Sequence, residues 1–567
     1  KMRKRWNIAK HDHSAAERLA DELGVHRLVA ALMIARGHAE PEAARAFLEP
    51  SLDHLHGPQL LKGLGEAVER IEAAIRSKEK ILIWGDYDVD GTTGTVLLRS
   101  VLRILGAETE YHIPDRFSEG YGLNIDALRA AKERGCSLVI TVDCGIRSFE
   151  PLEWAAENGL DVIVTDHHLS DEERGNPPAV AVVNPNQPSC GYPDKHLAGV
   201  GVAFKLAHAL LRSAGKETLM PSFLKIAAIG TVADIMQLTG ENRAIVALGL
   251  RDLPNTRNYG LKALMEVAGC TSEMTSMHIG FRLGPRINAA GRMDLGRHVV
   301  ELLEAEEFGA ARKLAEMLDS RNRERQSEQQ RITELALLRA ADQGPDPFVV
   351  VAGEGWHRGV IGLAASRIAE RLYRPAIVLS TENGTAHGSA RSVGDFHILR
   401  ALESCADLFD QFGGHAAAAG MKLPTSNIDS LRRALCEYAE SEIAEENRIP
   451  ELSIDARVSS GSLSIGLVRE LSRMEPFGAG NPKPVLATKG LSLRFEPKVM
   501  KDRHLKLYLS DPEGRRFEAV WWDGVERGKE QTLDLGRNIE VAYTLDVNSW
   551  QGSERLQLVI EDIRDDN

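Results

Sequence analysis

The sequence predicts an α/β protein in which a doubly wound, mainly parallel sheet is followed by a smaller α/β domain and a small β-barrel. Between residues 80 and 183, short apolar runs of strand length alternate with helical stretches, which is the pattern of a doubly wound sheet. Beyond residue 451 the pattern changes to short strands separated by turns. With 567 residues, 43% of them hydrophobic, the chain is long enough to bury several cores.

The first sheet domain is expected over residues 79–306. Residues 1–78 precede it with helical patterns around Leu19–Ala35 and at Pro41–Leu48, and we expect this region to cap the sheet domain. The expected strands are Ile81–Trp84, Glu108–Ile113, Ser137–Val142, Asp161–Thr165 and Val180–Val183. Helical stretches separate the strands at Thr92–Ile104, Ile125–Arg134 and Pro151–Asn158.

Three further regions complete the chain. Residues 307–345 are rich in good helix formers and have no breaker between Gly309 and Gly344, so they predict one long connecting helix. Residues 346–446 predict a second, smaller α/β domain. Residues 447–567 predict an OB-fold-like barrel that binds single strands, with strand-like runs at Val485–Ala487, Leu505–Leu509, Glu518–Trp522, Ile539–Thr544 and Leu556–Ile560.

The composition predicts a soluble, cytoplasmic protein. No apolar run approaches the roughly 20 residues needed to cross a bilayer, and no apolar stretch follows the basic N-terminus as in a secretory signal. The six cysteines include no CxxC pair, which argues against a disulfide framework and a zinc ribbon. A net charge of −13 opposes nucleic-acid binding, unless many of the carboxylates hold cations.

Three aspartates at alternate positions follow the first expected strand, in the segment Asp86-Tyr-Asp88-Val-Asp90-Gly91. Their position places the carboxylates at the carboxyl end of that strand, which is the edge where open α/β sheets bind ligands. Close carboxylates repel one another and need a cation, and Mg²⁺ or Mn²⁺ is the natural partner. The segment therefore predicts a metal site.

Three other interpretations use the same residues. An EF-hand loop also begins Asp-x-Asp-x-Asp-Gly, but its twelfth position needs a glutamate, and that position is Leu97 here. Asp88-Val-Asp90-Gly-Thr also resembles the haloacid-dehalogenase phosphatase signature, in which the first aspartate is a nucleophile. A solvated turn is the third interpretation.

The next two strands favour a shared metal site. One ends at Asp143, and the following one ends in Asp166-His167-His168. Carboxylates and imidazoles from three strands would then meet at one sheet edge. Asp234 interrupts an apolar stretch, where burying an unpaired carboxylate would be costly and metal ligation would remove the cost.

These motifs, in this order, resemble those of the DHH phosphoesterase superfamily, which is named for the motif matched by Asp166-His167-His168. The other superfamily motifs are matched by Asp86–Gly91, Val142–Gly145 and Ala233-Asp234. Two further segments resemble a motif of the RecJ branch and the hallmark of the DHH-associated second domain: Arg286-Ile-Asn288-Ala-Ala-Gly291-Arg292 and Phe412-Gly413-Gly414-His415. The resemblance runs from about residue 80 to 425 and continues in Glu475–Pro482 of the last domain.

The resemblance implies a role for each motif residue. Asp143 would bridge two metal ions. The remaining ligands would be Asp88 for one ion and Asp90, His167 and Asp234 for the other. Asp86 would contribute near the first ion. Asp166 and His168 would orient His167 or contact the substrate phosphate. DHH pyrophosphatases carry a histidine ligand where this chain has Trp84, so the first ion is expected to have one ligand fewer.

Two glycine-rich segments of the second α/β domain predict phosphate binding. Glycines let backbone N–H groups approach an anion, and an arginine can then bind it with two hydrogen bonds. The candidates are Ser389, Arg391, Gly413, Gly414 and His415. By resemblance, Arg286, Asn288 and Arg292 would line the same cleft. Two ordinary tight turns are the alternative for the glycine-rich segments.

Basic and apolar residues alternate from Arg494 to Lys506 in the last domain, and Trp521, Trp522 and Trp550 offer possible stacking faces. OB-folds bind single strands with this mixture. Tryptophans in a small barrel are core residues at least as often, so both interpretations stay open for each of the three.

The resemblance implies a single-stranded-DNA-specific 5′→3′ exonuclease that acts in DNA repair and recombination. It would use two Mn²⁺ or Mg²⁺ ions to hydrolyse phosphodiester bonds and release 5′-mononucleotides. Single-strand-binding protein and a RecQ-type helicase are the implied partners, and we expect a monomer that contacts no membrane. The alternatives are a phosphoesterase for cyclic dinucleotides or short RNA and a non-catalytic DNA-binding scaffold.

Overall fold

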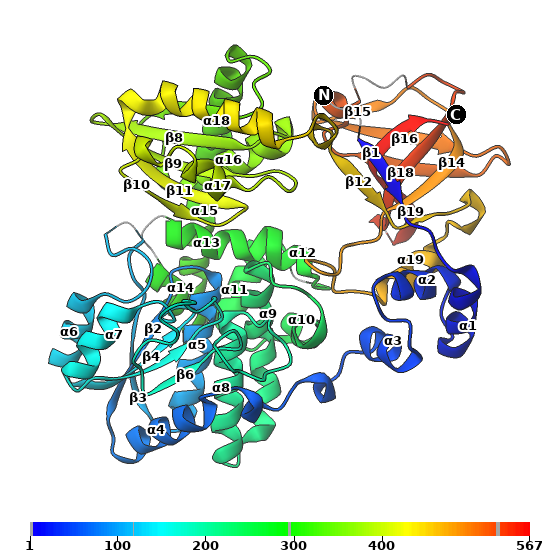
Figure 1. Ribbon diagram of the computed structural model, residues 1–567. Helices are drawn as coiled ribbons and strands as arrows, with labels where there is room; N and C mark the ends of the chain where they lie inside the picture. The colour runs from blue at the N-terminus through cyan, green and yellow to red at the C-terminus, as the bar shows by residue number, and fades with distance from the viewer. Residues whose placement is uncertain are drawn as a thin grey trace. The chain divides into compact units, whose positions relative to one another are not determined.

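The structure is a computed structural model that describes residues 4–116, 118–270, 272–292, 296–528, 533–550 and 552–566 (Figure 1). The chain folds as two compact units. The first unit comprises Glu42–Arg323 and Arg473–Lys483, and the second comprises Lys1–Pro41, Glu324–Ser472 and Pro484–Asn567. Within the described ranges, no helix has both the length and the apolar character that a membrane span requires.

A five-stranded sheet forms the centre of the first unit. In spatial order its strands are β3 (Glu108–His112), β2 (Lys80–Gly85), β4 (Cys136–Val142), β5 (Asp161–Thr165) and β6 (Ala181–Val183). All neighbouring strands run parallel. Each strand lies at a run predicted from the sequence, and the predicted parallel α/β sheet is confirmed.

Helices cover both faces of this sheet because successive strand residues point to opposite sides. On one face Ile81 and Ile83 join a core with α4 (Leu64–Arg76), α5 (Val89–Ile104) and α8 (Gly199–Ser213). On the other face Leu82 and Trp84 join a core with α6 (Ile125–Glu133) and α7 (Phe149–Glu157). The helices therefore make the sheet doubly wound, as predicted.

The strand order changes direction at β2, because β3 lies on one side of β2 and β4 lies on the other. Such a switch point leaves a crevice outside the carboxyl ends of the two strands, and open α/β sheets bind their ligands there. The topology thus marks the ends of β2 and β4 as the place to look for a site.

The rest of the first unit is helical. Its helices are α3 (Pro41–Leu48), α9 (Leu224–Ala233), α10 (Gly240–Asp252), α11 (Tyr259–Val267), α12 (Ser276–His278), the π-helical turn η5 (Ile279–Leu283), α13 (Gly284–Arg292) and α14 (Gly296–Leu303). The long helix predicted from the sequence is α15 (Phe308–Asp342). The division between the two units falls inside it, after Arg323.

The second α/β domain contains a mixed sheet. In spatial order its strands are β10 (Gln411–Gly414), β11 (Ala418–Pro424), β9 (Thr385–Arg391), β8 (Ala376–Glu382) and β7 (Val349–Glu354). Only β7 and β8 run parallel to each other. The helices are α16 (Arg358–Leu372), α17 (Ile398–Glu403) and α18 (Ile428–Glu442).

All five strands predicted for the last domain are present: β14 (Leu486–Leu493), β16 (His504–Ser510), β17 (Arg516–Trp521), β18 (Asn538–Trp550) and β19 (Ser553–Asp565). They pair in the order β14-β18-β19-β17-β16, and β14 also pairs with β16, which closes the sheet on itself. Three short strands and two helices accompany them: β12 (Glu451–Ile454), β13 (Ala456–Arg457), β15 (Lys498–Met500), α19 (Ile465–Ser472) and α20 (Gly524–Arg527).

The N-terminal region differs from expectation in two ways. The helical pattern around Leu19–Ala35 is two helices, α1 (His13–Leu23) and α2 (Arg27–Ala35), because Gly24 adopts a left-handed φ of 63° and ends α1. Strand β1 (Arg5–Ile8), which the sequence analysis does not predict, pairs in parallel with β12. Residues up to Pro41 therefore group with the C-terminal part of the chain. The domain boundaries drawn from the sequence stay predictions.

Candidate metal centre

Acidic residues from β2 and β4 converge at the switch point. Asp86 directly follows β2, Asp88 caps the N-terminus of α5 by accepting a hydrogen bond from the Gly91 amide (2.9 Å), and Asp90 lies in the first turn of that helix. Asp86 and Asp90 are buried, with exposed fractions of 4% and 1%. The alternate spacing seen in the sequence thus spreads the three carboxylates over a strand end and a helix start.

Asp143 follows β4 and stands at the middle of the cluster. Its backbone has a left-handed φ of 64°, which is unusual for a residue with a side chain, and its amide donates to the Thr165 carbonyl at the end of β5 (3.1 Å). Such conformations persist where the surrounding structure imposes them and often occur at functional sites. Here the turn directs a buried carboxylate into the site.

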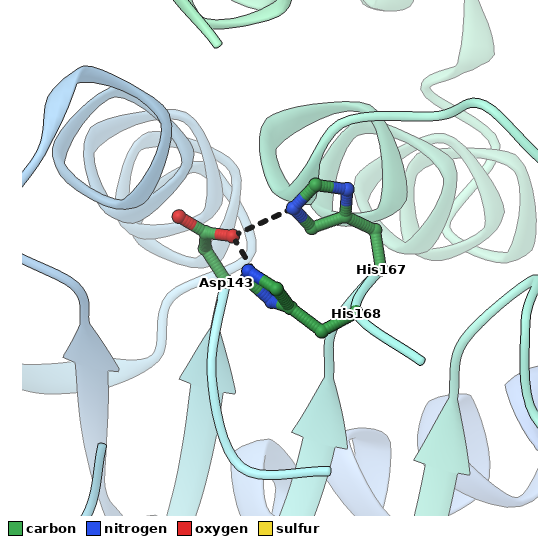
Figure 2. A group of neighbouring side chains, drawn as sticks. All are labelled: Asp143, His167 and His168. Atoms are coloured by element: carbon green, nitrogen blue, oxygen red, sulfur yellow. Dashed lines mark ion pairs between the residues drawn. The ribbon is translucent and has the colours of Figure 1, made fainter. Parts of the chain in front are cut away.

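Two histidines from the end of β5 face Asp143 (Figure 2). The Oδ1 atom of Asp143 lies 3.1 Å from Nε2 of His167 and 3.9 Å from Nδ1 of His168. The same Nε2 atom lies 3.7 Å from Asp234 Oδ2, which arrives from the C-terminal end of α9. The structure therefore brings together candidate ligands from β2, β4, β5 and α9.

Within the described residues, three groups can each place their ligand atoms within 4.8 Å of one another: Asp86–Asp88–Asp143, Asp90–His167–Asp234 and Asp143–His167–His168. Asp143 belongs to two of these groups, and so does His167. The first two groups share no residue, and Asp143 connects them. This arrangement fits two cations with Asp143 between them.

Electrostatics of the cluster favour bound cations. Burial, followed by repulsion from Asp88, raises the pKa of Asp86 to about 8, and the same two causes raise the pKa of Asp234 to about 7. Burial and the neighbouring carboxylates also raise the pKa of Asp90 and Asp143. Divalent ions would relieve this repulsion, and a carboxylate-rich set with one or two imidazoles suits Mn²⁺ or Mg²⁺.

Two further observations fit a metal. Among the described residues, Asp86 Oδ1 and Asp143 Oδ1 are buried atoms that make no hydrogen bond. Buried oxygens rarely lack a partner, and a bound cation would supply one. Burial, followed by repulsion from His168, lowers the pKa of His167 to about 4. His167 is therefore neutral at neutral pH, which is the form that binds metals.

Asp90 and Asp143 are held in place by the N-terminus of α8. The amides of Gly199 and Val200 each donate to one oxygen of Asp90, both at 2.6 Å. A Cβ at position 199 would lie 2.5 Å from the Cβ of Asp143, so only glycine fits there. Gly199 is not among the residues predicted from the sequence, where its signal is a glycine at the start of an apolar helical stretch.

Asp166 lies behind the cluster and belongs to none of the three groups. It is fully buried and accepts hydrogen bonds from the amides of Ile146 (3.0 Å) and His167 (2.7 Å) and from Nδ1 of His168 (2.7 Å). Burial alone would raise the pKa of Asp166, but the hydrogen bond from His168 and the amides lower it. Asp166 is thus a charged carboxylate that accepts the hydrogen bond from His168 and fixes the orientation of its ring.

A cavity of about 340 Å³ opens onto the cluster. It is lined by Asp86, Tyr87, Asp88, Arg116, Tyr121, Asp143, His168, Asp234, Asn288 and Gly291. The Tyr121 hydroxyl donates to the Asp143 carbonyl (3.1 Å), and the Arg116 guanidinium lies 5.0 Å from the centre of the Tyr87 ring. Arg116 and Tyr121 are not among the residues predicted from the sequence, although both lie in the loop after β3, at the same edge of the sheet.

Comparison with known proteins gives one consistent result. Three parts of the chain match family descriptions: residues 80–231 the DHH family N-terminal domain, residues 346–441 the DHHA1 domain and residues 454–562 the RecJ OB domain. The single-stranded-DNA-specific exonuclease RecJ of Bacillus subtilis is 40% identical over 98% of this chain and 70% of its own length, and that of Escherichia coli is 35% identical over 91% and 92%. The chain belongs to the RecJ family.

Solved RecJ structures agree with this membership. The RecJ of Thermus thermophilus crystallised with Mn²⁺ superposes with a TM-score of 0.85 at 30% identity, covering 100% of this chain and 80% of that chain. The same protein was also crystallised with Mg²⁺, and that structure superposes with a TM-score of 0.80. The RecJ of Thermus thermophilus thus binds the two ions that the carboxylate-rich ligand set predicts for this chain.

Trp84, which replaces the histidine of DHH pyrophosphatases, offers no ligand in this RecJ-family chain. Its side chain is fully buried in the core beneath α6 and α7, and its ring centre lies 4.3 Å from that of His112 on β3. The group Asp86–Asp88–Asp143 therefore consists of carboxylates alone among the described residues.

The predicted substrate-binding residues are spread over both units. Asn288 lines the cavity beside the carboxylates, and Arg286 does not. Arg286 forms an ion pair with Asp319 of α15 (2.8 Å) and donates to the Arg282 carbonyl (2.7 Å), because the buried Asp319 carboxylate needs a partner. The side chain of Arg292 lies outside the part of the chain that the structure describes.

The remaining candidates lie on the sheet of the second α/β domain. Ser389 and Arg391 lie on β9, Gly413 and Gly414 lie on β10, and the exposed His415 follows β10. The site for a Cβ on Gly362, in the second turn of α16, lies 3.0 Å from the Arg391 guanidinium and 3.4 Å from Ser389 Oγ. Ser389 and Arg391 therefore face the same part of α16.

Proposed function

We propose that this chain degrades single-stranded DNA from its 5′ end with bound divalent metal ions and releases 5′-mononucleotides, in DNA repair and recombination. One observation carries the proposal. Asp143 connects two separate ligand groups at the switch point of a parallel sheet, as a two-metal phosphodiesterase requires. The relatives that cover nearly the whole chain are named single-stranded-DNA-specific exonucleases, and their name supports this choice of substrate.

The residues of the cluster have distinct tasks in this proposal. Divalent cations at such a site supply a nucleophilic water at neutral pH and neutralise the charge that develops on the phosphate. Asp86 and Asp88 would hold one cation, and Asp90, His167 and Asp234 the other, with Asp143 between them. Asp166 holds the His168 ring at the cavity wall, where this ring would contact the scissile phosphate.

Arg391 and Ser389 are the candidates for reading the 5′ end. A two-metal centre would cut any phosphodiester that reaches it, so the polarity needs a separate determinant. A terminal phosphate carries more charge than an internal phosphodiester, and an arginine beside a hydroxyl can select it. The two side chains converge next to Gly362, which favours a joint site; His415, Gly413 and Gly414 would contact the strand nearby.

The last domain would bind the strand further along. Trp522 and Phe495 are exposed; Trp522 follows β17, and Phe495 precedes β15. The basic side chain of Lys498 is on β15, and those of Lys501 and Arg503 are in the turn between β15 and β16. Exposed aromatic rings among basic residues favour stacking of single-stranded bases. Trp521 is buried instead and belongs to the core, and the side chain of Trp550 lies outside the described residues.

The oligomeric state, the compartment and the protein partners are part of the proposal. We propose that the chain works as a monomer in the cytoplasm with single-strand-binding protein and a RecQ-type helicase as partners. Only the resemblance to RecJ supports these partners. Sedimentation of the purified protein would test the monomer, and pull-down with each purified partner would test the contacts.

A nuclease assay on labelled DNA tests the proposed function. We expect single strands to be degraded with Mn²⁺ or Mg²⁺, duplexes of the same sequence to survive, and EDTA to stop the reaction. A 5′-labelled strand should release labelled mononucleotide at once, whereas a 3′ label should stay on long products until late. Early release of a 3′ label would reverse the proposed polarity. Hydrolysis of cyclic dinucleotides without DNA degradation would favour the small-substrate alternative.

A further inference from the structure

The turn that carries Asp234 contains a strained residue. After α9, Ile235 adopts a left-handed φ of 57°, and the Met236 amide returns to the Thr231 carbonyl (3.2 Å). Glycine is the usual residue at this position of a helix end, because a branched side chain there is disfavoured. The Ile235 side chain is 76% exposed, so its own burial does not offset the cost. Other contacts must hold the turn.

Those contacts come from a distant part of the chain. Glu475–Pro482, which we call the Gly-Asn loop, lies between α19 and β14, yet it belongs to the first unit. The Leu238 amide donates to the Ala479 carbonyl (2.7 Å). A Cβ at Gly478 would lie 2.7 Å from the Leu238 side chain, and one at Gly480 would lie 2.1 Å from the Gln237 side chain. The loop therefore packs directly on residues 237–239.

The Gly-Asn loop is itself built rigidly. Asn481 is 1% exposed, and its side-chain amide donates to the carbonyls of Met474 and Pro476, both at 2.8 Å. The buried Arg243 of α10 donates to the Glu475 carbonyl (2.7 Å), and Ser276 of α12 donates to the Phe477 carbonyl. A loop fixed at several points can hold the segment that it touches.

We propose that the Gly-Asn loop is a positioning element for Asp234. By holding residues 237–239, it keeps Ile235 in its strained conformation and so directs the Asp234 carboxylate toward His167. The inference rests on the proposed function, because it takes Asp234 as a metal ligand. It also explains three residues of the Glu475–Pro482 segment, which lies outside the sheet domain in sequence. Gly478 and Gly480 leave room for the side chains of Leu238 and Gln237, and the buried Asn481 holds the loop together.

Metal affinity tests the inference without any nuclease assay. We would titrate Mn²⁺ into full-length variants, detect free Mn²⁺ by electron paramagnetic resonance, and measure the melting temperature of each. Gly480→Ala and Asn481→Ala should weaken Mn²⁺ binding by about 10- to 100-fold, the range for residues that orient a ligand. Gly514→Ala is the matched control, because Gly514 also has a left-handed φ (83°) but has no atom within 4 Å of the new methyl group. It should lower the melting temperature and leave Mn²⁺ affinity unchanged.

Two more variants separate the possible failures. Ile235→Gly should relieve the turn, so in the Asn481→Ala background it should restore part of the lost Mn²⁺ affinity. Equal Mn²⁺ affinity in Gly480→Ala, Asn481→Ala and Gly514→Ala would make the loop merely structural and overturn the inference. Absence of rescue by Ile235→Gly would equally overturn the proposed route through the turn. If Asp234→Asn leaves Mn²⁺ affinity unchanged, the ligand assignment itself fails.

Discussion

The two α/β domains differ in how deeply they bury the candidate functional side chains. In the sheet domain of the first unit, the carboxylates of Asp90, Asp143 and Asp166 are almost fully buried and come from α5, the end of β4 and the end of β5. In the second α/β domain, the candidate residues Ser389 and Arg391 are half-buried, and His415 is exposed. Buried carboxylates need a partner of opposite charge, whereas half-exposed polar groups are solvated by water until a substrate binds. The contrast suggests a fixed catalytic centre in one domain and an adaptable substrate surface in the other.

Removing the central carboxylate charge is the strongest test of this contrast. We expect Asp143→Asn to lose several kcal/mol of transition-state stabilisation, about 10³-fold or more in kcat, because Asp143 connects the two ligand groups. Most affinity for single-stranded DNA should remain, because binding is spread over a long surface. Single-turnover rates and anisotropy titrations would measure the two effects. Near-normal turnover would remove Asp143 from the centre of the reaction.

A second buried charge in the first unit extends the comparison to stability. Lys205 is fully buried, forms an ion pair with Glu241 and donates to the His56 carbonyl (2.7 Å). Lys205→Met should lower the free energy of unfolding by about 3–5 kcal/mol, because Glu241 would keep a buried, uncompensated charge. Urea denaturation would measure the loss, and adding Glu241→Gln should recover part of it.

An exposed pair of the second α/β domain is the control for Lys205. Arg367 and Glu370 lie 3.5 Å apart on α16, with side chains 66% and 67% exposed. Arg367→Met should change the free energy of unfolding by less than about 1 kcal/mol. Equal losses for Lys205→Met and Arg367→Met would show that burial does not distinguish the two domains.

The sequence could predict where the acidic cluster forms because Asp86, Asp143 and Asp166 each follow an apolar run of strand length. Strand-length runs place Asp86 and Asp143 at the carboxyl ends of β2 and β4, and parallel strands bring those ends together. No knowledge of distant contacts is needed for this step. The same reasoning predicts the five strands of the sheet.

Features that depend on contacts between distant segments could not be predicted. The Gly199 amide meets Asp90 only after α8 packs beside α5, and the Gly-Asn loop meets Leu238 across more than two hundred residues of sequence. Strand β1 has four residues, two of them exposed and two half-buried, so its pattern is weak, and its pairing with β12 defines it. The Gly-Asn loop follows Glu446 in sequence but belongs to the first unit. Truncation of the chain near Glu446, at the predicted boundary of the last domain, would therefore remove part of the first unit.

Arg391 tests whether the second α/β domain provides the substrate surface. Arg391→Ala should cost about 1.5–3 kcal/mol of transition-state binding on 5′-phosphorylated strands, the range for a charge-assisted hydrogen bond, and less on 5′-hydroxyl strands. The measurement is kcat/KM on both end chemistries, with melting temperature alongside. Arg367→Ala, which removes an exposed arginine of the same domain that pairs with Glu370, is the charge control. An equal loss on both ends with a lower melting temperature would make Arg391 a brace for its strand.

The smallest expected effect concerns two adjacent tryptophans of the last domain. Trp522 is 51% exposed and lies edge-on to His504 (4.8 Å between ring centres), whereas Trp521 is 1% exposed. Base stacking on an exposed ring contributes about 1–3 kcal/mol, and we expect the lower end for Trp522→Ala because half of the ring is already covered. Affinity for a long labelled oligothymidine should therefore fall about fivefold, as about 1 kcal/mol implies. Trp521→Phe should leave this affinity unchanged, because its ring is part of the core. A larger loss of affinity for Trp521→Phe than for Trp522→Ala would mean that strand binding depends on the shape of the core and not on the exposed ring.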